Sequence, residues 1–436
     1  MIKRILNSNM SMSLLSNGAT ALLGFVNLGL IAHQFSKFDA GNWFMLLTVY
    51  TLLEMFRSGW VQTPFVRYFV VAANDEERSK LTGASWQLLL LFTLATAVLL
   101  SSLYFIRIDN NAFRLAKRFT ILWLFSALPY QLLLWQLQAR SEFKLLSIIR
   151  LIFPVGFTVL LLLRAKYNFS IEATVVWYAL IQFLIGLAGV VFGWLHLGRW
   201  NTDLKTERKK LSNYGKFSML TMITSSLLRS SDQFIIAFWL GPAAVAVYSI
   251  PQKLIEVIEI PVRSFASIAI PHATSLWQQE KIKELRLFFY RQCGLLTAIV
   301  LPMLLVFFCF PNFIVSLLGG SKYHQSTLLL QIFCFYAMLI PIDRYCGVLL
   351  DASHRPKKNT VKVVIMLVTN VSLDILALWI GTGIYGVAAG STITFLIGIV
   401  MGWVQLKDIL EVFTAKLFWH EGVSKSIKRL RGQPTL

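Results

Sequence analysis

Charged side chains interrupt the long apolar stretches of this sequence, and they are its first indication of chemistry. The cations in these stretches are Arg57, Arg150, Arg229, Lys253, Arg263 and Arg344, and the acids are Glu54, Asp232, Glu256, Glu259, Asp343 and Asp374. If the stretches cross a bilayer, a charge near its centre costs several kcal/mol unless it faces a bundle interior or a water-filled cavity. Each of these residues is therefore a candidate functional residue.

Local spacing pairs some of these charges. Three pairs of opposite charge stand three residues apart: Glu54 with Arg57, Arg229 with Asp232, and Lys253 with Glu256. Such pairs share a helix face and can simply neutralise one another, or lie near a helix end where long side chains reach water. Taken together, cations in both halves of the chain can instead line a central cavity that holds an anionic head group. The predicted substrate-binding residues of this cavity are Arg57, Arg150, Arg229, Arg263 and Arg344.

Four acids are candidates for coupling transport to an ion gradient: Glu54, Asp232, Glu259 and Asp374. An adjacent arginine lowers a carboxyl pKa, whereas desolvation or a neighbouring acid raises it. Glu54 and Asp232 each have an arginine three residues away, which favours a permanently ionised partner. Glu259 is crowded by Glu256, and Asp374 has no cation nearby in the sequence, so these two are the better candidates for binding a proton or cation. The alternative is that all four only neutralise cavity arginines.

The composition indicates which elements must position these residues. The 436 residues are 56% hydrophobic and 14% charged, with a mean hydropathy of +0.64, whereas a soluble domain has about 25% charged residues. This excludes an ordinary cytosolic globular enzyme. Because one span takes about 20 apolar residues, the apolar runs predict about twelve spans, at roughly 12–34, 42–66, 82–106, 118–138, 145–164, 173–197, 217–239, 243–270, 292–317, 325–350, 360–380 and 384–404.

The basic residues predict the orientation of these spans. When the loops are assigned alternately to two sides, 27 of the 41 Lys and Arg residues fall on the side of the N-terminus and 8 on the other. By the positive-inside rule, both termini lie in the cytoplasm. The apolar stretch from about Met12 to Ile31 is longer than the core of a signal peptide and lacks a small-residue cleavage site. We therefore expect a retained first helix.

A long polar loop divides the chain into two similar parts. Residues 199–216 form a basic cytoplasmic linker between an N-terminal six-helix half, 1–198, and a C-terminal six-helix half, 217–404. An offset of 205 residues places Glu54 on Glu259, and even-numbered halves give parallel repeats with substrate between them. The predicted fold is thus an all-α polytopic membrane protein with about twelve transmembrane helices in two parallel six-helix halves around a central cavity. Residues 405–436 predict an amphipathic, basic cytoplasmic tail attracted to anionic membrane lipid.

Several other kinds of chemistry lack their sequence signatures. There is no G-x-x-x-x-G-K-[ST] phosphate loop, no pair of histidines at i, i+4, and no C-x-x-C spacing among the four cysteines. The non-cytoplasmic loops span no more than about a dozen residues, which is short for a catalytic domain outside the membrane. We expect no enzymatic activity, no cofactor, no metal site and no nucleic-acid partner.

Segments in both halves of the chain carry a family resemblance. Phe38 to Phe44, the following apolar span and the turn Asp75 to Arg78 look like the opening of polysaccharide-biosynthesis flippases of the multidrug/oligosaccharidyl-lipid/polysaccharide exporter superfamily. Segments 231–236 and 240–248 resemble the seventh-to-eighth span signature of that family, and 385–390 resembles its twelfth-span entry. Ala246 departs from the pattern, since many members have glycine there.

The resemblance implies a function. It implies a carrier in the bacterial inner membrane that moves an undecaprenyl-pyrophosphate-linked oligosaccharide to the outer leaflet by alternating access, as in assembly of lipopolysaccharide O-antigen, alongside a polysaccharide polymerase and a chain-length regulator. Trp43, Trp60 and Trp135 are candidates for sugar contacts or for the membrane interface. Two alternatives stay open: a multidrug or small-cation exporter of the same superfamily, which calls for a more acidic cavity, and a non-transporting scaffold of an envelope-assembly complex.

Overall fold

The computed structural model describes residues 9–105, 111–200 and 203–411, and within them all regular secondary structure is helical. The chain begins with α2 (Asn9–Gln34), α3 (Lys37–Arg57), the π-helix η1 (Ser58–Gln62), α4 (Thr63–Val71), α5 (Asp75–Phe105), η2 (Asn111–Phe113), α6 (Arg114–Ala139), α7 (Phe143–Tyr167), α8 (Ile171–Val191) and α9 (Lys205–Leu240). It continues with α10 (Pro242–Gln278), α11 (Ile282–Cys309), α12 (Pro311–Gly319), η3 (Ser321–Tyr323), α13 (Ser326–Ala352), α14 (Pro356–Trp379), α15 (Gly383–Gln405) and α16 (Lys407–Leu410).

These helices confirm an all-α polytopic membrane protein. Each predicted span overlaps a long helix or a run of joined helices, as α3, η1 and α4 show. Eight of the described helices have the length and apolar composition needed to cross a membrane. They are α5, α6, α7, α8, α11, α13, α14 and α15. By contrast, α3, α9 and α10 carry most of the charged residues that the sequence placed inside spans, so their role depends on where those charges lie.

The sixth predicted span ends earlier than expected. Helix α8 stops at Val191, and the chain then turns back over the end of α6. The buried side chain of Gln136 holds this turn, since its Nε2 donates to the carbonyl oxygen of His196 over 2.7 Å and its Oε1 accepts from the His196 amide over 2.9 Å. Arg140 adds a bond to the carbonyl of Trp194. The apolar residues after Val191 therefore cover a helix end instead of extending the span.

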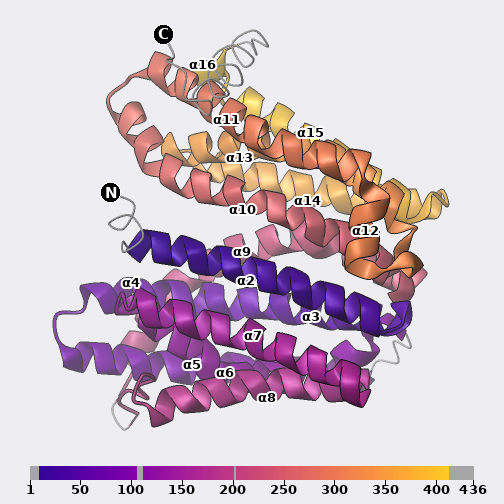
Figure 1. Cartoon of the computed structure of the whole chain (residues 1–436). Coiled ribbons are helices and arrows are strands. Elements are labelled where there is room, and N and C mark those ends of the chain that lie inside the picture. The colour runs from indigo at the N-terminus through magenta and orange to yellow at the C-terminus, as the bar shows by residue number, and fades with distance from the viewer. Residues whose placement is uncertain (1–8, 106–110, 201–202, 412–436) are drawn as a thin grey trace. The chain divides into compact units, whose positions relative to one another are not determined.

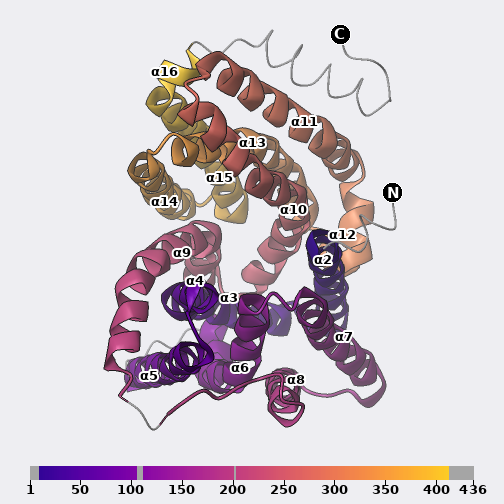
Figure 2. The same cartoon turned by 90° about the vertical axis from the view of Figure 1, so that its left-hand side faces the viewer.

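Contacts divide the chain into two compact units, one ending at Ala246 and the other beginning at Val247. This boundary lies in the second turn of α10, shortly after the end of α9. Helix α9 joins the first unit because it packs along η1, α3, α4 and α5, and Figures 1 and 2 show it among these helices. The repeat of two six-helix halves stays a prediction.

The core of the first unit is rich in aromatic rings. The Trp43 ring stacks on Phe157 with centroids 5.3 Å apart, and Trp123 stacks on Tyr178 at 4.2 Å. Trp43 is 4% exposed and Trp135 is 2% exposed, while the half-buried Trp60 donates to the hydroxyl of Ser212. Trp43 and Trp135 are therefore packing residues of the core, and of the three tryptophans only Trp60 keeps a partly open ring.

Two glycines bring α9 against η1. A Cβ atom at Gly59 would lie 2.5 Å from the Cα of Met219, and one at Gly215 would overlap the carbonyl oxygen of Trp60. Because the obstructing atoms are backbone, they cannot move aside by a change of rotamer. The two helices pack closely only where these positions lack a side chain.

Gly215→Ala is therefore expected to lower the free energy of unfolding by about 1–3 kcal/mol, the usual range for overpacking. Gly24→Ala is the matched control, because no atom lies within 4 Å of a Cβ built there. In that helix interior alanine is expected to stabilise, by up to about 1 kcal/mol. Equilibrium unfolding of both variants in detergent micelles measures the difference. Equal stability of the two would contradict close packing of α9 on η1.

In the second unit, α13 packs against α11 and α15, and α14 packs against α15. Two arginines hold the chain that follows α15. Arg355 donates to the Asp408 carboxylate, with Nη1 and Oδ1 2.8 Å apart, and Arg286 donates to Glu411 over 2.7 Å. The bond from Arg355 lowers the pKa of Asp408. The predicted amphipathic helix is described only as far as Glu411, and the basic tail from Lys425 to Arg431 lies outside the described residues.

Candidate functional site

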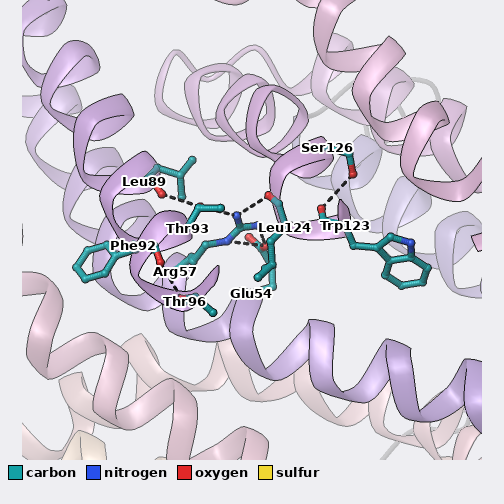
Figure 3. Close-up of polar contacts among 9 residues, drawn as sticks. All are labelled: Glu54, Arg57, Leu89, Phe92, Thr93, Thr96, Trp123, Leu124 and Ser126. Carbon is teal, nitrogen blue, oxygen red and sulfur yellow. Dashed lines mark hydrogen bonds and ion pairs between the residues drawn. The ribbon is translucent and has the colours of Figure 1, made fainter. Parts of the chain in front are cut away.

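Arg57 is the most enclosed of the five arginines predicted to bind the head group. Its side chain is 1% exposed and pairs with Glu54, as their spacing predicted. Figure 3 shows the guanidinium between three helices: Nε donates to Glu54 Oε2 over 3.1 Å on α3, and Nη1 donates to Thr93 Oγ1 of α5 over 3.0 Å and to the Leu124 carbonyl of α6 over 2.7 Å. Arg57 thus connects three helices of the first unit.

The surroundings of Arg57 favour a positioning role. It is the last residue of α3, and the wider turns of η1 begin at the next residue. A guanidinium that donates to a carboxylate, a hydroxyl and a carbonyl within the protein already has strong partners. To reach an anionic ligand it would have to leave all of them. We therefore assign Arg57 first to fixing the junction of α3 and η1 against α5 and α6.

The other four arginines are more open. Arg150 and Arg263 are half-buried, and Arg229 and Arg344 are exposed. Arg263 lies on α10 and forms an ion pair with Glu259, with Nη2 and Oε2 3.2 Å apart. Arg150 of α7 and Arg263 of α10 are therefore the partly buried cations best suited to bind an anion, because partial burial strengthens a charge interaction.

Helix α10 carries two ion pairs along its length. Lys253 and Glu256 are 2.7 Å apart, as their spacing predicted, and Glu259 pairs with Arg263 one turn later. The pairs predicted at a spacing of three residues did not include Glu259, whose partner Arg263 stands four residues later. Because Arg263 already occupies this carboxylate as an ion-pair partner, Glu259 is a weaker candidate for the coupling role.

Asp374 has different surroundings. It is 0% exposed and accepts a hydrogen bond from Asn370 Nδ2 over 3.3 Å, one turn earlier on α14. A Cβ atom at Gly390 of α15 would lie 3.7 Å from Asp374 Oδ1, so this glycine lets α15 approach the carboxyl group. Buried Ser391 and Thr394 follow on α15. Asn370, Asp374, Ser391 and Thr394 are buried polar residues of these two packed helices and are here called the α14–α15 polar cluster. Their side chains carry oxygen atoms, the ligands that hard cations prefer.

Asp232, on α9 of the first unit, is also buried. It is 6% exposed, and the hydroxyl of Ser231 donates to its Oδ1 over 3.4 Å. The pairing of Arg229 with Asp232 and the coupling role of Asp232 stay predictions.

The structure adds a buried cation that was not among the predicted site residues. Lys362 falls at the start of the predicted span 360–380, lies inside α14 and is 2% exposed. Its Nζ donates to Asp343 Oδ1 over 2.7 Å and to the Asp343 carbonyl over 3.2 Å. Glycine at position 402 of α15 leaves room for the lysine stem, since a Cβ there would lie 3.7 Å from Lys362 Cδ. The valines on either side of Lys362 were the signal for this burial.

The comparisons with known proteins agree with this architecture. Residues 39–328 match the model of a family described as polysaccharide biosynthesis protein. An uncharacterized membrane protein of Methanocaldococcus jannaschii is 21% identical, over 95% of this chain and 85% of that protein.

Solved structures share the fold at low sequence identity. The lipid II flippase MurJ in an inward closed conformation has a TM-score of 0.73 and 16% identity, with 96% of this chain and 91% of that chain covered. An inward-facing multidrug resistance transporter of the MATE family, from the MOP superfamily, has a TM-score of 0.73 and 12% identity, with 91% and 96% covered. A MOP-superfamily transporter of Pyrococcus furiosus, described as having a binding pocket of reverse polarity, has a TM-score of 0.62 and 13% identity, with 93% and 95% covered.

The family match extends over well more than half of the chain, from α3 into α13. Two structural findings agree with this family match: the helices that can cross a membrane, and the fold shared with solved structures such as the MOP-superfamily transporter. This multi-pass membrane protein therefore belongs to the polysaccharide biosynthesis protein family.

Proposed function

We propose that the protein is a flippase that moves an undecaprenyl-pyrophosphate-linked oligosaccharide from the cytoplasmic to the outer leaflet for assembly of a surface polysaccharide such as O-antigen. The observation that carries this proposal is the family match over residues 39–328. The fold shared with a lipid II flippase supports movement of a lipid-linked sugar. A polysaccharide polymerase and a chain-length regulator act next to such a carrier, and the protein itself catalyses no reaction.

The proposed orientation follows from charge. Both termini lie in the cytoplasm, since 27 of the 41 basic residues fall on that side when the loops alternate. Substrate therefore enters from the side of the loops between α4 and α5, α10 and α11, and α13 and α14. In a bacterium this membrane is the inner membrane.

The cations proposed to bind the pyrophosphate are those that the protein does not fully enclose. Arg150 is half-buried on α7 of the first unit, and Arg263 is half-buried on α10 of the second unit. A guanidinium matches the oxygens of a phosphate with two parallel hydrogen bonds. Arg229 and Arg344 are the further candidates. Arg57 contributes by fixing α3 against α5 and α6.

A transport assay tests the function and the cations together. The purified protein is reconstituted into liposomes with a fluorescent undecaprenyl-pyrophosphate oligosaccharide, and glycosidase added outside reports which leaflet holds the sugar. The parent is expected to move the glycolipid, and Arg150→Ala/Arg263→Ala to do so at least about tenfold more slowly, because a hydrogen bond to a charged group contributes about 1.5–3 kcal/mol. Lys357→Gln/Lys358→Gln, which replaces two exposed cations in the first turn of α14, is the control for lost charge. A parent that leaves the glycolipid in place contradicts the proposal.

One alternative has a specific observation in its favour. The multidrug transporter matches the fold with the same TM-score as the lipid II flippase. The same liposomes loaded with a fluorescent cationic drug distinguish the two. Export of the drug without movement of the glycolipid would establish the exporter instead.

A further inference from the structure

A pocket of about 720 Å³ lies between α10 and α11, within the second unit. Its walls are mainly apolar, with Phe265 and Leu276 from α10 and Leu287 and Leu295 from α11. Pockets of about 300–1,000 Å³ with apolar walls and a few polar groups are typical of sites for small organic ligands. The residues that line this pocket include none of the cations proposed to bind the pyrophosphate and no member of the α14–α15 polar cluster.

The polar groups of the pocket favour an anion. Arg291 and Gln292 lie side by side on α11, and His272 faces them from α10, where its ring contacts Phe288 with centroids 5.0 Å apart. The hydroxyl of Tyr345 donates to Gln292 Oε1 over 3.4 Å, which directs the amide so that its NH₂ group serves as the donor. Among the described residues that line the pocket, Glu284 is the acid, and Lys281 lies 3.7 Å from its carboxylate. The positive charge of Arg291 therefore dominates.

The pocket combines this cation with a membrane location. Helix α11 is one of the helices that can cross a membrane, and Arg291 stands nine residues after its start at Ile282, about 13 Å along the axis. The hairpin end next to it carries Lys281 and Lys283. The pocket is thus positively charged toward the turn between α10 and α11 and apolar farther along α11. A ligand that joins an anionic group to an apolar chain matches this distribution, with its charged group toward the turn.

We propose that the α10–α11 pocket binds an anionic phospholipid of the surrounding bilayer, with its phosphate on Arg291 and the upper part of an acyl chain along Phe265 and Leu295. A pocket of about 720 Å³ holds a glycerophosphate head and the first carbons of a chain, in line with the volume range for drug-sized ligands. An oligosaccharide pyrophosphate is far larger. This site goes beyond the proposed function, because its ligand is a bilayer lipid and not the transported molecule.

Native mass spectrometry tests the site. The parent protein is released from nanodiscs that contain equal amounts of phosphatidylglycerol and phosphatidylcholine, and the ratio of the two lipids that stay bound is measured. We expect the parent to retain phosphatidylglycerol in preference. Arg291→Gln should reduce that preference about tenfold, because a charge-assisted hydrogen bond to phosphate is lost. Lys357→Gln removes the same charge from an exposed position outside the pocket and should retain the parent ratio.

Two further variants keep the test decisive. Ala269→Leu fills the pocket without a change of charge and should also reduce retention of phosphatidylglycerol, whereas Arg291→Lys keeps the charge and should retain part of the preference. Elution on size exclusion and the melting temperature establish that each variant is folded. Equal retention of the two lipids by the parent, or an unchanged ratio in both Arg291→Gln and Ala269→Leu, would overturn the proposal. Displacement of phosphatidylglycerol by a tenfold lower amount of undecaprenyl pyrophosphate would also overturn it, by assigning the pocket to the substrate.

Discussion

Replacing Arg57 by methionine is expected to lower the free energy of unfolding by about 3–5 kcal/mol, because removal of one partner of a buried ion pair leaves the other charge buried without its counter-ion. Glu54 would keep its carboxylate in a protein interior where Arg57 now donates to it, and Thr93 and the Leu124 carbonyl would lose their shared donor. Chemical unfolding of the protein in mixed micelles, followed by circular dichroism, measures the change.

Two further variants separate this ion pair from charge loss in general. Glu54→Gln/Arg57→Met removes both charges and should recover most of the stability, since replacing both partners of a buried pair is often close to neutral. Arg78→Met removes the cation of the Arg78–Asp75 pair, which has the same spacing but lies on the surface with 44% and 97% of the side chains exposed. A surface pair contributes about 0–1 kcal/mol, so this variant should be almost as stable as the parent.

The same experiment decides between the two roles of Arg57. If Arg57→Met is as stable as the parent and yet no longer moves the glycolipid, Arg57 contacts the head group, as its place among the charged residues of the sequence first indicated. If stability and transport fall together and both return in the double variant, Arg57 positions the helices.

Replacing Asp374 by asparagine is expected to remove the dependence of transport on an ion gradient. The asparagine amide has the same shape and can still accept the hydrogen bond from Asn370. It carries no negative charge, so it cannot bind a proton or a cation as a carboxylate does. Coupling between two sites typically changes an affinity by about 5–150-fold, and the stimulation of transport by the gradient should fall by a factor in that range. Liposomes with an imposed proton or sodium gradient, with and without an ionophore, measure the stimulation.

Glu259→Gln is the matched comparison for this prediction. Glu259 forms an ion pair with Arg263, so its replacement should change the rate of transport more than its gradient dependence. We propose Asp374 and its α14–α15 polar cluster as the first site of coupling, with Asp232 and Glu54 as the remaining candidates. Full gradient dependence in Asp374→Asn would remove Asp374 from this role and leave Asp232 and Glu54 as the candidates.

The sequence alone determined the class of the protein and its helical order. Its apolar runs predicted about twelve spans, and each of them overlaps a long helix, because a bilayer requires that backbone polar groups be satisfied within each segment. Spacing along a helix also predicted the Glu54–Arg57 and Lys253–Glu256 pairs. Partners three residues apart are fixed by helix geometry and need no tertiary information.

Tertiary packing decided which of the charged residues are enclosed and by what. The sequence does not reveal that Arg57 also contacts α5 and α6, since Thr93 and Leu124 are 36 and 67 residues away. Nor does it reveal that Lys362 donates to Asp343, which lies nineteen residues earlier on α13. A buried charge is retained only where distant atoms offset its desolvation, and those atoms meet only when helices far apart in the chain pack together.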